Sequence, residues 1–336
     1  MGNLLFNYEN TDTEKEHSKD EKERIGNIMS RMKADDVKFV RFELSDIYGV
    51  ARSKIVPVKH FESKATRGTE FSFSYMAWDP SGNFISDAEF AAARGGCAPD
   101  VLTFPDMDTY TTIPWRENTG RILIEPTLKG KPVAAHPRTV ARQQLDSLKE
   151  LGYALYSAYE HEFSVVNKDT LEPYTQGNNC RSTLRNDKDP DLTRQLMTDL
   201  PKVGVDIEVF ESEWGAGQIE IVNKPSFGIQ AADTSHTCRI SVKEIAIEHG
   251  YIASFMTKPW PENDSRTALH FNHSLWDIKG ENSMMTDNNS NGLSIVAQHW
   301  IAGVLAHVPA IAVLMAPTVN CLKTYHIKWY HCSHVS

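Results

Sequence analysis

Apolar positions follow two different periods in the first part of the chain. One group recurs at helical spacing, which predicts an amphipathic helix: Ile25, Ile28, Met29 and Met32. A second group alternates with charged residues, which predicts a strand: Val40, Phe42 and Leu44. The segment from Asp46 to Gly49 supplies a turn, so a β-hairpin is expected there. Further strand-like segments follow in "VLTFPDM" and "GRILIEPTL". They predict a strand-rich first domain over residues 25–130.

The second half reads as helices alternating with acidic strands. Pro137 opens an expected helix that Gly152 ends. The strand "YEHEFSVV" follows, and then the strands "IEVFESEW" and "QIEIV", which the glycine-rich turn "GAG" joins. Residues 230–249 predict a helix, "TALHFNHSLWD" predicts a strand, and residues 293–307 predict a long helix. The polar segment 173–195 is interpreted as a loop.

Two further segments are distinguished by composition. Residues 9–24 are charged and nearly free of apolar side chains, so residues 1–24 are expected to be a disordered tail. The stretch "WIAGVLAHVPAIAVLMAP" is apolar enough to suggest a membrane span, but it contains His307 and Pro309. We therefore expect a buried core helix that is kinked or broken at the proline.

Composition narrows the class of protein. Of 336 residues, 40% are hydrophobic and 24% are charged, which is typical of a soluble globular protein. The formal charge of -9 argues against nucleic-acid binding. The five cysteines are dispersed, which favours reduced thiols and a cytoplasmic location. The N-terminus has no signal-peptide pattern, and Phe6 stands where a myristoylation motif needs Ser or Thr.

Acidic residues gather on the predicted strands. Glu160 and Glu162 share one strand face, because side chains two apart point the same way. Four further residues lie on neighbouring strands: Glu211, Glu213, Glu220 and His270. Clustered carboxylates with an imidazole suit Mg²⁺ or Mn²⁺, and such an ion would neutralise acids that otherwise repel each other.

Each of these features also has an ordinary explanation. A single glutamate on a strand is more often a solvent-facing residue than a metal ligand, and His270 alone is more often a hydrogen-bonded structural histidine. The combination with "GAGQIEI" is more specific than any one residue.

At this point the sequence resembles the glutamine synthetases. The resemblance rests on "YEHEF", "SEWGAGQIEI", "FMTKPW" with "LHFNHSLWD", and the helix that ends in "APTVNC". Further details, such as "VRFELSDIYGVARSKIVP", point to a lens-associated branch of that family. The resemblance implies an α+β protein: an N-terminal β-grasp domain, then a catalytic-type domain over residues 131–323 with a curved antiparallel sheet and flanking helices. It also implies stacked hexameric rings.

The resemblance assigns roles to individual residues. One metal site would use Glu162, Glu213 and Glu220, and a second would use Glu160 and His270. We assign Asn272 and Ser274 to nucleotide binding. In the family, two Mg²⁺ or Mn²⁺ ions bridge the ATP phosphates and the γ-carboxylate of glutamate, which is phosphorylated and then attacked by ammonia.

The sequence departs from the family pattern at several positions. Arg266 and Ala268 stand where glycines are expected to hold the substrate amino group. The stretch "FSFSYMAW" has no acid before Asp79 where the family has an ammonium-binding aspartate, and Thr324 replaces a substrate-binding arginine. Residues 324–336 do not resemble the family. Their histidines and Cys332 match no standard zinc spacing, so an unstructured tail is expected.

Two functions remain open. The first is a non-catalytic scaffold or cytoskeleton-associated protein that keeps a metal-binding acidic pocket, forms homo-oligomers, and binds intermediate-filament proteins. The second is an ATP-dependent ligase that joins ammonia or an amine to a γ-carboxylate, active only in a full-length form. Losing one arginine in phosphoryl transfer costs roughly 10³ to 10⁵ in rate, which favours the first.

Overall fold

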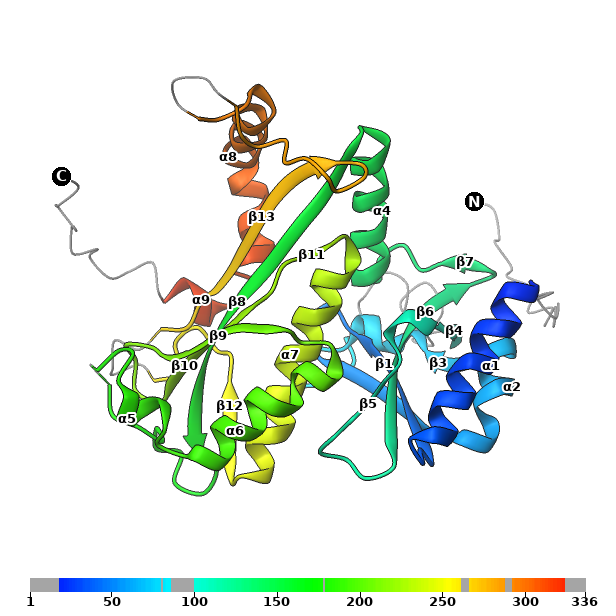
Figure 1. Ribbon diagram of the computed structural model, residues 1–336, viewed down its shortest axis with the longest axis horizontal. Helices are drawn as coiled ribbons and strands as arrows, with labels where there is room; N and C mark the ends of the chain where they lie inside the picture. The colour runs from blue at the N-terminus through cyan, green and yellow to red at the C-terminus, as the bar shows by residue number, and fades with distance from the viewer. Residues whose placement is uncertain are drawn as a thin grey trace. The chain divides into compact units, whose positions relative to one another are not determined.

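The computed structural model describes residues 18–79, 81–85, 100–177, 179–260, 266–287 and 292–323. The chain divides into two compact units between Thr139 and Val140 (Figure 1). Two predicted segments fall outside the described residues. They are most of the N-terminal tail and the whole of segment 324–336, which includes Thr324.

The first helix begins earlier than predicted. Helix α1 spans Lys19–Ala34, so its first turns lie in the charged stretch that was expected to be disordered. Ser18 accepts a hydrogen bond from the Glu21 backbone N–H, and the Glu21 carboxylate accepts one from the Ser18 backbone N–H. This capping box satisfies backbone donors that would otherwise be unpaired, so charged residues can begin a helix without an apolar face.

The first unit is a mixed sheet with helices packed against it. The predicted hairpin is confirmed as β1 (Phe39–Ser45) and β2 (Ala51–Pro57). The strand order is β2-β1-β6-β4-β3, with β3 Thr69–Ser72, β4 Asp100–Pro105 and β6 Thr119–Leu128. Strands β1 and β6 are parallel, as a β-grasp domain requires. Short strands β5 (Thr111–Thr112) and β7 (Lys131–Pro132) also pair with β6. Apolar side chains of α1 and α2 (Phe61–Arg67) join those of the sheet in one core.

The second unit is organised around one long strand. Strand β8 (Tyr153–Asn167) pairs antiparallel with four others: β10 (Gln218–Asn223), β11 (Ser226–Phe227), β12 (Tyr251–Ser254) and β13 (Leu269–Asp277). Strand β9 (Ile207–Ser212) pairs with β10 at the edge. Helix α7 (Ile229–Glu248) packs against β8 and β12 (Figure 1). His161 and Phe163 of β8 contact Phe255 on the α7 side, so the alternate residues Glu160 and Glu162 occupy the other face.

The segment interpreted as a loop contains two helices. They are α5 (Thr183–Asn186) and α6 (Pro190–Asp199). Asp189 caps α6 through the Leu192 backbone N–H, and Pro190 occupies its first turn. Leu192 and Leu196 are its buried residues. These two leucines stand among polar residues, so the sequence shows no helical pattern of apolar positions there. The prediction of a loop is therefore wrong for these two helices. Helix α4 (Pro137–Glu150) agrees with its prediction.

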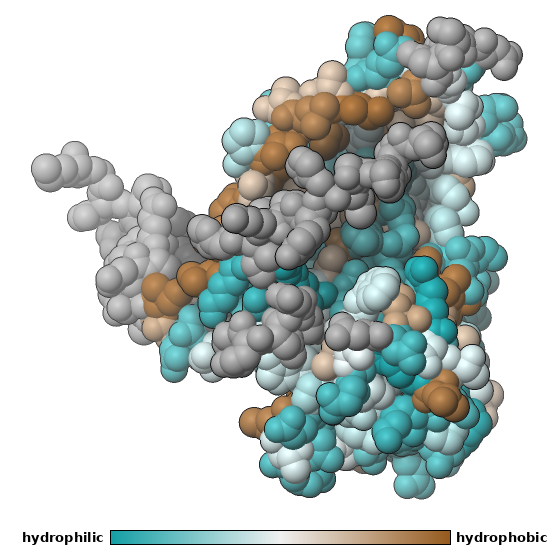
Figure 2. Space-filling view, turned by 90° about the vertical axis from the view of Figure 1, so that its left-hand side faces the viewer, coloured by the Kyte–Doolittle hydropathy of each residue, from teal (hydrophilic) through white to brown (hydrophobic). Residues whose placement is uncertain are grey.

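The apolar helix near the end of the described chain is longer and more exposed than predicted. Helix α8 (Ile295–Met315) continues through Pro309 without a break, and short helix α9 (Val319–Leu322) follows it. Ala297 is the one buried residue of α8 among the residues described, so it is not a core helix there. Apolar surface covers the upper part of the face in Figure 2, where Figure 1 places α8. By length and composition alone α8 would also suit a membrane, a property that it shares with apolar helices of soluble proteins.

Candidate metal and nucleotide site

Strand pairing brings the predicted acidic residues onto one face of the sheet. Glu220 lies directly opposite Glu162 on β8 and opposite Glu211 on β9. His270 on β13 lies opposite Glu160 on β8. Residues that face each other across antiparallel strands have their Cβ atoms about 5 Å apart. The pairing of the strands therefore places acidic residues from three separate sequence motifs on one surface.

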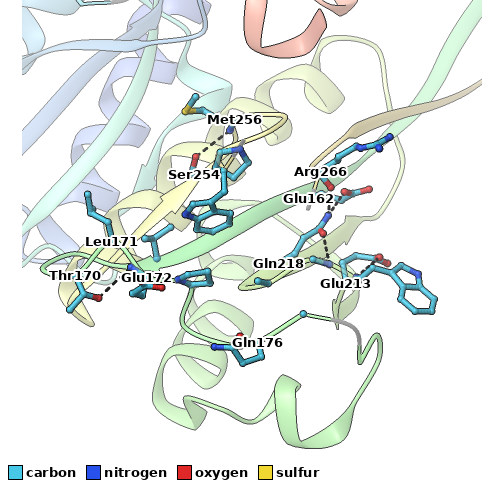
Figure 3. A pocket seen from close by; sticks show the side chains of 18 residues that line it. Glu162, Thr170, Leu171, Glu172, Gln176, Glu213, Gln218, Ser254, Met256 and Arg266 are labelled. Carbon is cyan, nitrogen blue, oxygen red and sulfur yellow. Dashed lines mark hydrogen bonds between the residues drawn. The ribbon is translucent and has the colours of Figure 1, made fainter. Parts of the chain in front are cut away.

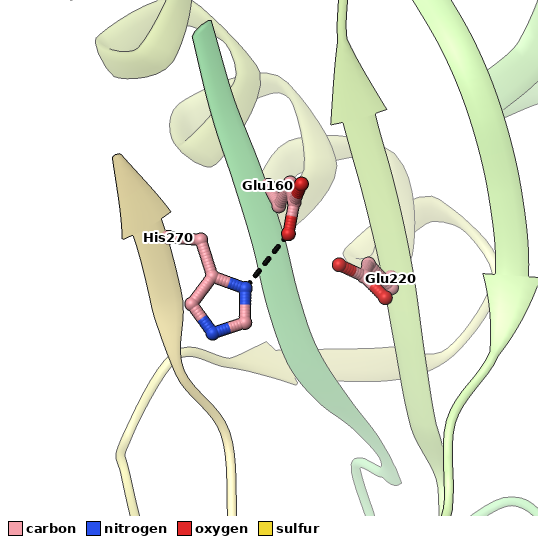
Figure 4. Close-up of side chains that lie close together, drawn as sticks. All are labelled: Glu160, Glu220 and His270. Carbon is pink, nitrogen blue, oxygen red and sulfur yellow. Dashed lines mark hydrogen bonds and ion pairs between the residues drawn. The ribbon is translucent and has the colours of Figure 1, made fainter. Parts of the chain in front are cut away.

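One group consists of Glu160, Glu220 and His270, each from a different strand (Figure 4). Their nearest ligand atoms all lie within 4.8 Å of one another. The Nδ1 atom of His270 lies 2.7 Å from Glu160 Oε2, and the Asn272 side-chain amide donates to Glu160 Oε1 at 2.7 Å. The hydrogen bond that His270 donates to Glu160 raises the pKa of His270 above its ordinary value. Without a metal ion, the imidazole thus acts as a partner for the carboxylate.

A second group consists of Glu211, Glu213 and Glu220, again with ligand atoms within 4.8 Å of one another. Glu220 belongs to both groups and is 7% exposed. Burial, and then the neighbouring carboxylates, raise the pKa of Glu220 to about 7. A glutamate whose pKa is raised by burial and by neighbouring carboxylates is a candidate for a functional site.

Glu162 lies beside these groups but is engaged in hydrogen bonds. Its carboxylate accepts one from the Gln218 side-chain amide at 2.5 Å and one from the Ala268 backbone N–H at 3.0 Å. Burial raises the pKa of Glu162 above its ordinary value. The assignment of Glu162 to a metal site with Glu213 and Glu220 stays a prediction, as does the pairing of Glu160 with His270 in the other site.

A tight turn fixes the position of Glu213. Gly217 has φ of +65°, and its backbone N–H donates to the Thr175 carbonyl at 2.9 Å. The buried Arg185 guanidinium donates to the carbonyls of Glu213 and Gly215 at 2.6 and 2.7 Å. These bonds hold the loop between β9 and β10 in one conformation. The sequence analysis missed Arg185 because it lies in the segment interpreted as a loop.

A cavity of about 1310 Å³ opens next to Glu162 and Glu213 (Figure 3). Both acidic and apolar residues line it, and the apolar ones include Leu171, Met256 and Trp260. Arg266 lines the same cavity. An organic molecule with a polar end toward the acids and an apolar body would suit these walls.

The predicted nucleotide-binding residues lie next to an aromatic cluster that the sequence analysis did not identify. The Ser274 hydroxyl accepts a hydrogen bond from Trp276 Nε1 at 2.9 Å. Trp276 and Phe227 both pack against Tyr156, with ring centroids 5.5 and 4.5 Å from it. Tyr156 lies on the same strand face as Glu160. Aromatic rings can stack on a planar base, so the cluster is compatible with a nucleotide. The role of Asn272 and Ser274 stays a prediction.

The donor set suits a divalent cation. Four carboxylates and one imidazole are hard or borderline ligands of the kind that Mg²⁺ and Mn²⁺ accept. Burial first, and then the neighbouring carboxylates, raise the pKa of Glu220, and a bound cation would offset the repulsion among these acids. A divalent cation held here would neutralise phosphate oxygens of a bound nucleotide.

A family model described as the catalytic domain of glutamine synthetase matches residues 134–331. The chain belongs to the glutamine synthetase family. Members of this family depend on ATP and divalent metal ions. The α+β fold with a β-grasp domain and a curled sheet is confirmed.

Similar proteins include lengsin and a glutamate–amine ligase. Lengsin from Canis lupus familiaris is 33% identical over 311 residues, which covers 90% of this chain and 52% of lengsin. Glutamate–isopropylamine ligase from a Pseudomonas species is 30% identical over 318 residues, with 91% of this chain and 69% of the ligase covered. The chain thus spans about half the length of the lengsin that it matches. The details that pointed to a lens-associated branch are confirmed.

Solved structures support the fold. A structure titled "GmaS/ADP complex-Conformation 1" superposes with a TM-score of 0.77 at 22% identity and covers 92% of this chain and 68% of its own. A structure described as a novel glutamine synthase homolog has a TM-score of 0.78 at 24% identity, with 87% and 68% covered.

Two of the departures from the family pattern, Arg266 and Ala268, lie at the edge of the site. Arg266 and Ala268, where glycines were expected, contact it through their backbones: the Arg266 carbonyl accepts from Gln218 at 2.7 Å, and the Ala268 N–H donates to Glu162. Both residues carry side chains that a glycine lacks, so they leave less space beside the acidic residues than glycines would leave.

The raised pKa of Glu220 predicts a specific pH dependence in metal-free protein. Because its folded pKa of about 7 exceeds the ordinary value of 4.5, ionisation of Glu220 destabilises the folded state. The folded state should therefore lose stability as pH rises from 4.5 to about 7. In Glu220→Gln this loss is absent, so the variant should become increasingly more stable than wild type across that window. Denaturant unfolding in EDTA at several pH values measures the difference, and a pH-independent difference would contradict the assignment.

Proposed function

We propose that this chain is a metal- and nucleotide-binding member of the glutamine synthetase family that does not itself form γ-glutamyl amides. The observation that carries the proposal is the position of Glu220, which lies within reach of acids from two neighbouring strands and of His270. Clustered, partly buried carboxylates destabilise the folded protein unless a cation binds them. A bound metal ion would account for this arrangement.

The non-catalytic part of the proposal rests on the substrate side of the site. Arg266 and Ala268 replace glycines beside Glu162, and their backbones form hydrogen bonds with Gln218 and Glu162. Added side chains leave less room for a substrate amino group to approach the backbone. We place the protein in the cytoplasm as a homo-oligomer, and its binding to intermediate-filament proteins stays a prediction.

A ligase is the second candidate. The apolar walls of the cavity beside Glu213 would accommodate an amine larger than ammonia. Two relatives are named glutamate–isopropylamine ligase and glutamate–methylamine ligase. A longer form of the protein would then use the same metal ligands to activate a γ-carboxylate.

One assay with two readouts tests the proposal. The protein is incubated with Mn²⁺, ATP and glutamate, with hydroxylamine or isopropylamine as nucleophile. We expect Mn²⁺ and ATP to be retained in equilibrium dialysis, while ADP and γ-glutamyl product stay at the level of a Glu162→Ala control. Turnover above that control with hydroxylamine would overturn the non-catalytic assignment. Turnover with isopropylamine alone would favour the amine ligase.

A further inference from the structure

Arg181 forms a two-point ion pair with one of the clustered acids. Its Nε atom lies 2.7 Å from Glu211 Oε2, and its NH2 atom lies 2.9 Å from Glu211 Oε1. The Arg181 side chain is 67% exposed, whereas that of Glu211 is 17% exposed. The carboxylate is therefore mostly buried, and the cation covers it from the solvent side. A two-point fork of this kind is the strongest geometry available to an arginine–carboxylate pair.

The backbone holds Arg181 in place for this contact. Its φ is +58°, a left-handed conformation that is uncommon for a residue with a side chain. Its backbone N–H donates to the Ser212 carbonyl at 2.8 Å, and the Ser212 N–H donates to the Asn186 side-chain oxygen at 2.7 Å. The segment that carries Arg181 is thus tied to the strand that carries Glu211. This anchoring distinguishes the pair from a mobile surface contact.

The fork changes which carboxylates are available to a cation. Both oxygens of Glu211 accept hydrogen bonds from Arg181, while the carboxylates of Glu213 and Glu220 form no ion pair with an arginine in the part of the chain that the structure describes. We propose that Arg181 is a tethered counter-cation that withholds Glu211 from a divalent ion and directs the ion to Glu213 and Glu220. This positioning role rests on the proposed metal site.

The two cations must also repel each other. A metal ion bound by Glu213 and Glu220 would lie a few ångströms from the Arg181 guanidinium, since the ligand atoms of Glu211 and Glu220 lie within 4.8 Å. A divalent ion and an arginine 4 Å apart repel by about 2 kcal/mol even at the dielectric constant of water, which is roughly thirtyfold in affinity. Without a metal ion, the positive charge of Arg181 therefore offsets part of the repulsion among the carboxylates. The same charge weakens metal binding.

Calorimetric titration with Mn²⁺ tests the inference. We expect Arg181→Gln to bind Mn²⁺ roughly thirtyfold more tightly than wild type, because a positive charge is removed and Glu211 becomes available. Arg181→Lys keeps the charge and should stay close to wild type. Arg194→Gln is the matched control, since Arg194 forms an exposed pair with Asp191 on α6. It should leave the affinity unchanged.

Two further variants separate the inference from the proposed function. Arg181→Gln with Glu211→Gln should return to an affinity near wild type, because the added ligand is removed again. Unchanged or weaker binding by Arg181→Gln, in a wild type that binds Mn²⁺ and loses it on Glu213→Gln, would overturn the role of Arg181 alone. Absence of Mn²⁺ binding in wild type and Arg181→Gln alike would overturn the proposed metal site and this inference with it.

Discussion

Mn²⁺ should raise the unfolding temperature of wild-type protein, and the double variant Glu162→Ala with Glu220→Ala should lose that increase. At about one hundred times the dissociation constant, a ligand that binds only the folded state contributes about 2.7 kcal/mol. For a unit of roughly 200 residues this corresponds to an increase of about 5–10 °C. The double variant lacks the shared carboxylate of both acidic groups, so no cation can be held between the strands.

The comparison needs a control on the same sheet. Glu208 lies on β9 but is exposed and belongs to neither acidic group, so Glu208→Ala should keep the full Mn²⁺ effect. In EDTA the double variant should be at least as stable as wild type near pH 8, because mutual repulsion of the acids is relieved. Equal Mn²⁺ shifts in wild type and the double variant, or none in either, would remove the metal-site claim.

Gly217→Ala should destabilise the second unit by about 3 kcal/mol or more. A Cβ at this position would lie 2.4 Å from the Val165 carbonyl oxygen, and the backbone φ of +65° disfavours any side chain. Val165 also donates its backbone N–H to the Gly217 carbonyl at 2.8 Å, so the two segments cannot separate without losing a hydrogen bond. The loop that carries Glu213 should shift as a result, and Mn²⁺ affinity should fall.

Gly204→Ala is the matched control for this change. Gly204 has φ of +85°, yet no atom of another segment lies within 4 Å of the position that a Cβ would take there. Gly204→Ala should destabilise the protein only through the left-handed backbone conformation of the new alanine, by about 1–2 kcal/mol. Denaturant unfolding of both variants measures the difference. Similar losses of unfolding free energy in the two variants would contradict this expectation. They would show that the backbone near Val165 can move away from the added Cβ and that the turn is not closely constrained.

Much of the acidic site follows from the sequence because the strand period is simple. Glu160 and Glu162 had to share a face, and the glycine turn had to bring Glu220 back toward Glu213. The pairing of Glu220 with Glu162, and of His270 with Glu160, depends on the register between strands far apart in the sequence. Local patterns do not specify that register, so the resemblance to a family was needed to assign the sites.

Other features could not be predicted from local patterns. The ion pair between Arg181 and Glu211 joins residues 30 positions apart, through a left-handed residue that no motif indicates. The aromatic cluster around Tyr156 combines three separate strands, and its members resemble ordinary core residues in the sequence. The exposure of α8 was also unexpected, because its apolar composition alone predicts burial.

Anomalous X-ray scattering from crystals grown with Mn²⁺ tests the central claim most directly. The account predicts an anomalous difference peak between the carboxylates of Glu213 and Glu220, on the side facing Glu162, with the Arg181–Glu211 pair intact. A second peak between Glu160 and His270 would add the other predicted site. A map with ordered acidic side chains and no peak among them, at a Mn²⁺ concentration that saturates binding in solution, would contradict the account.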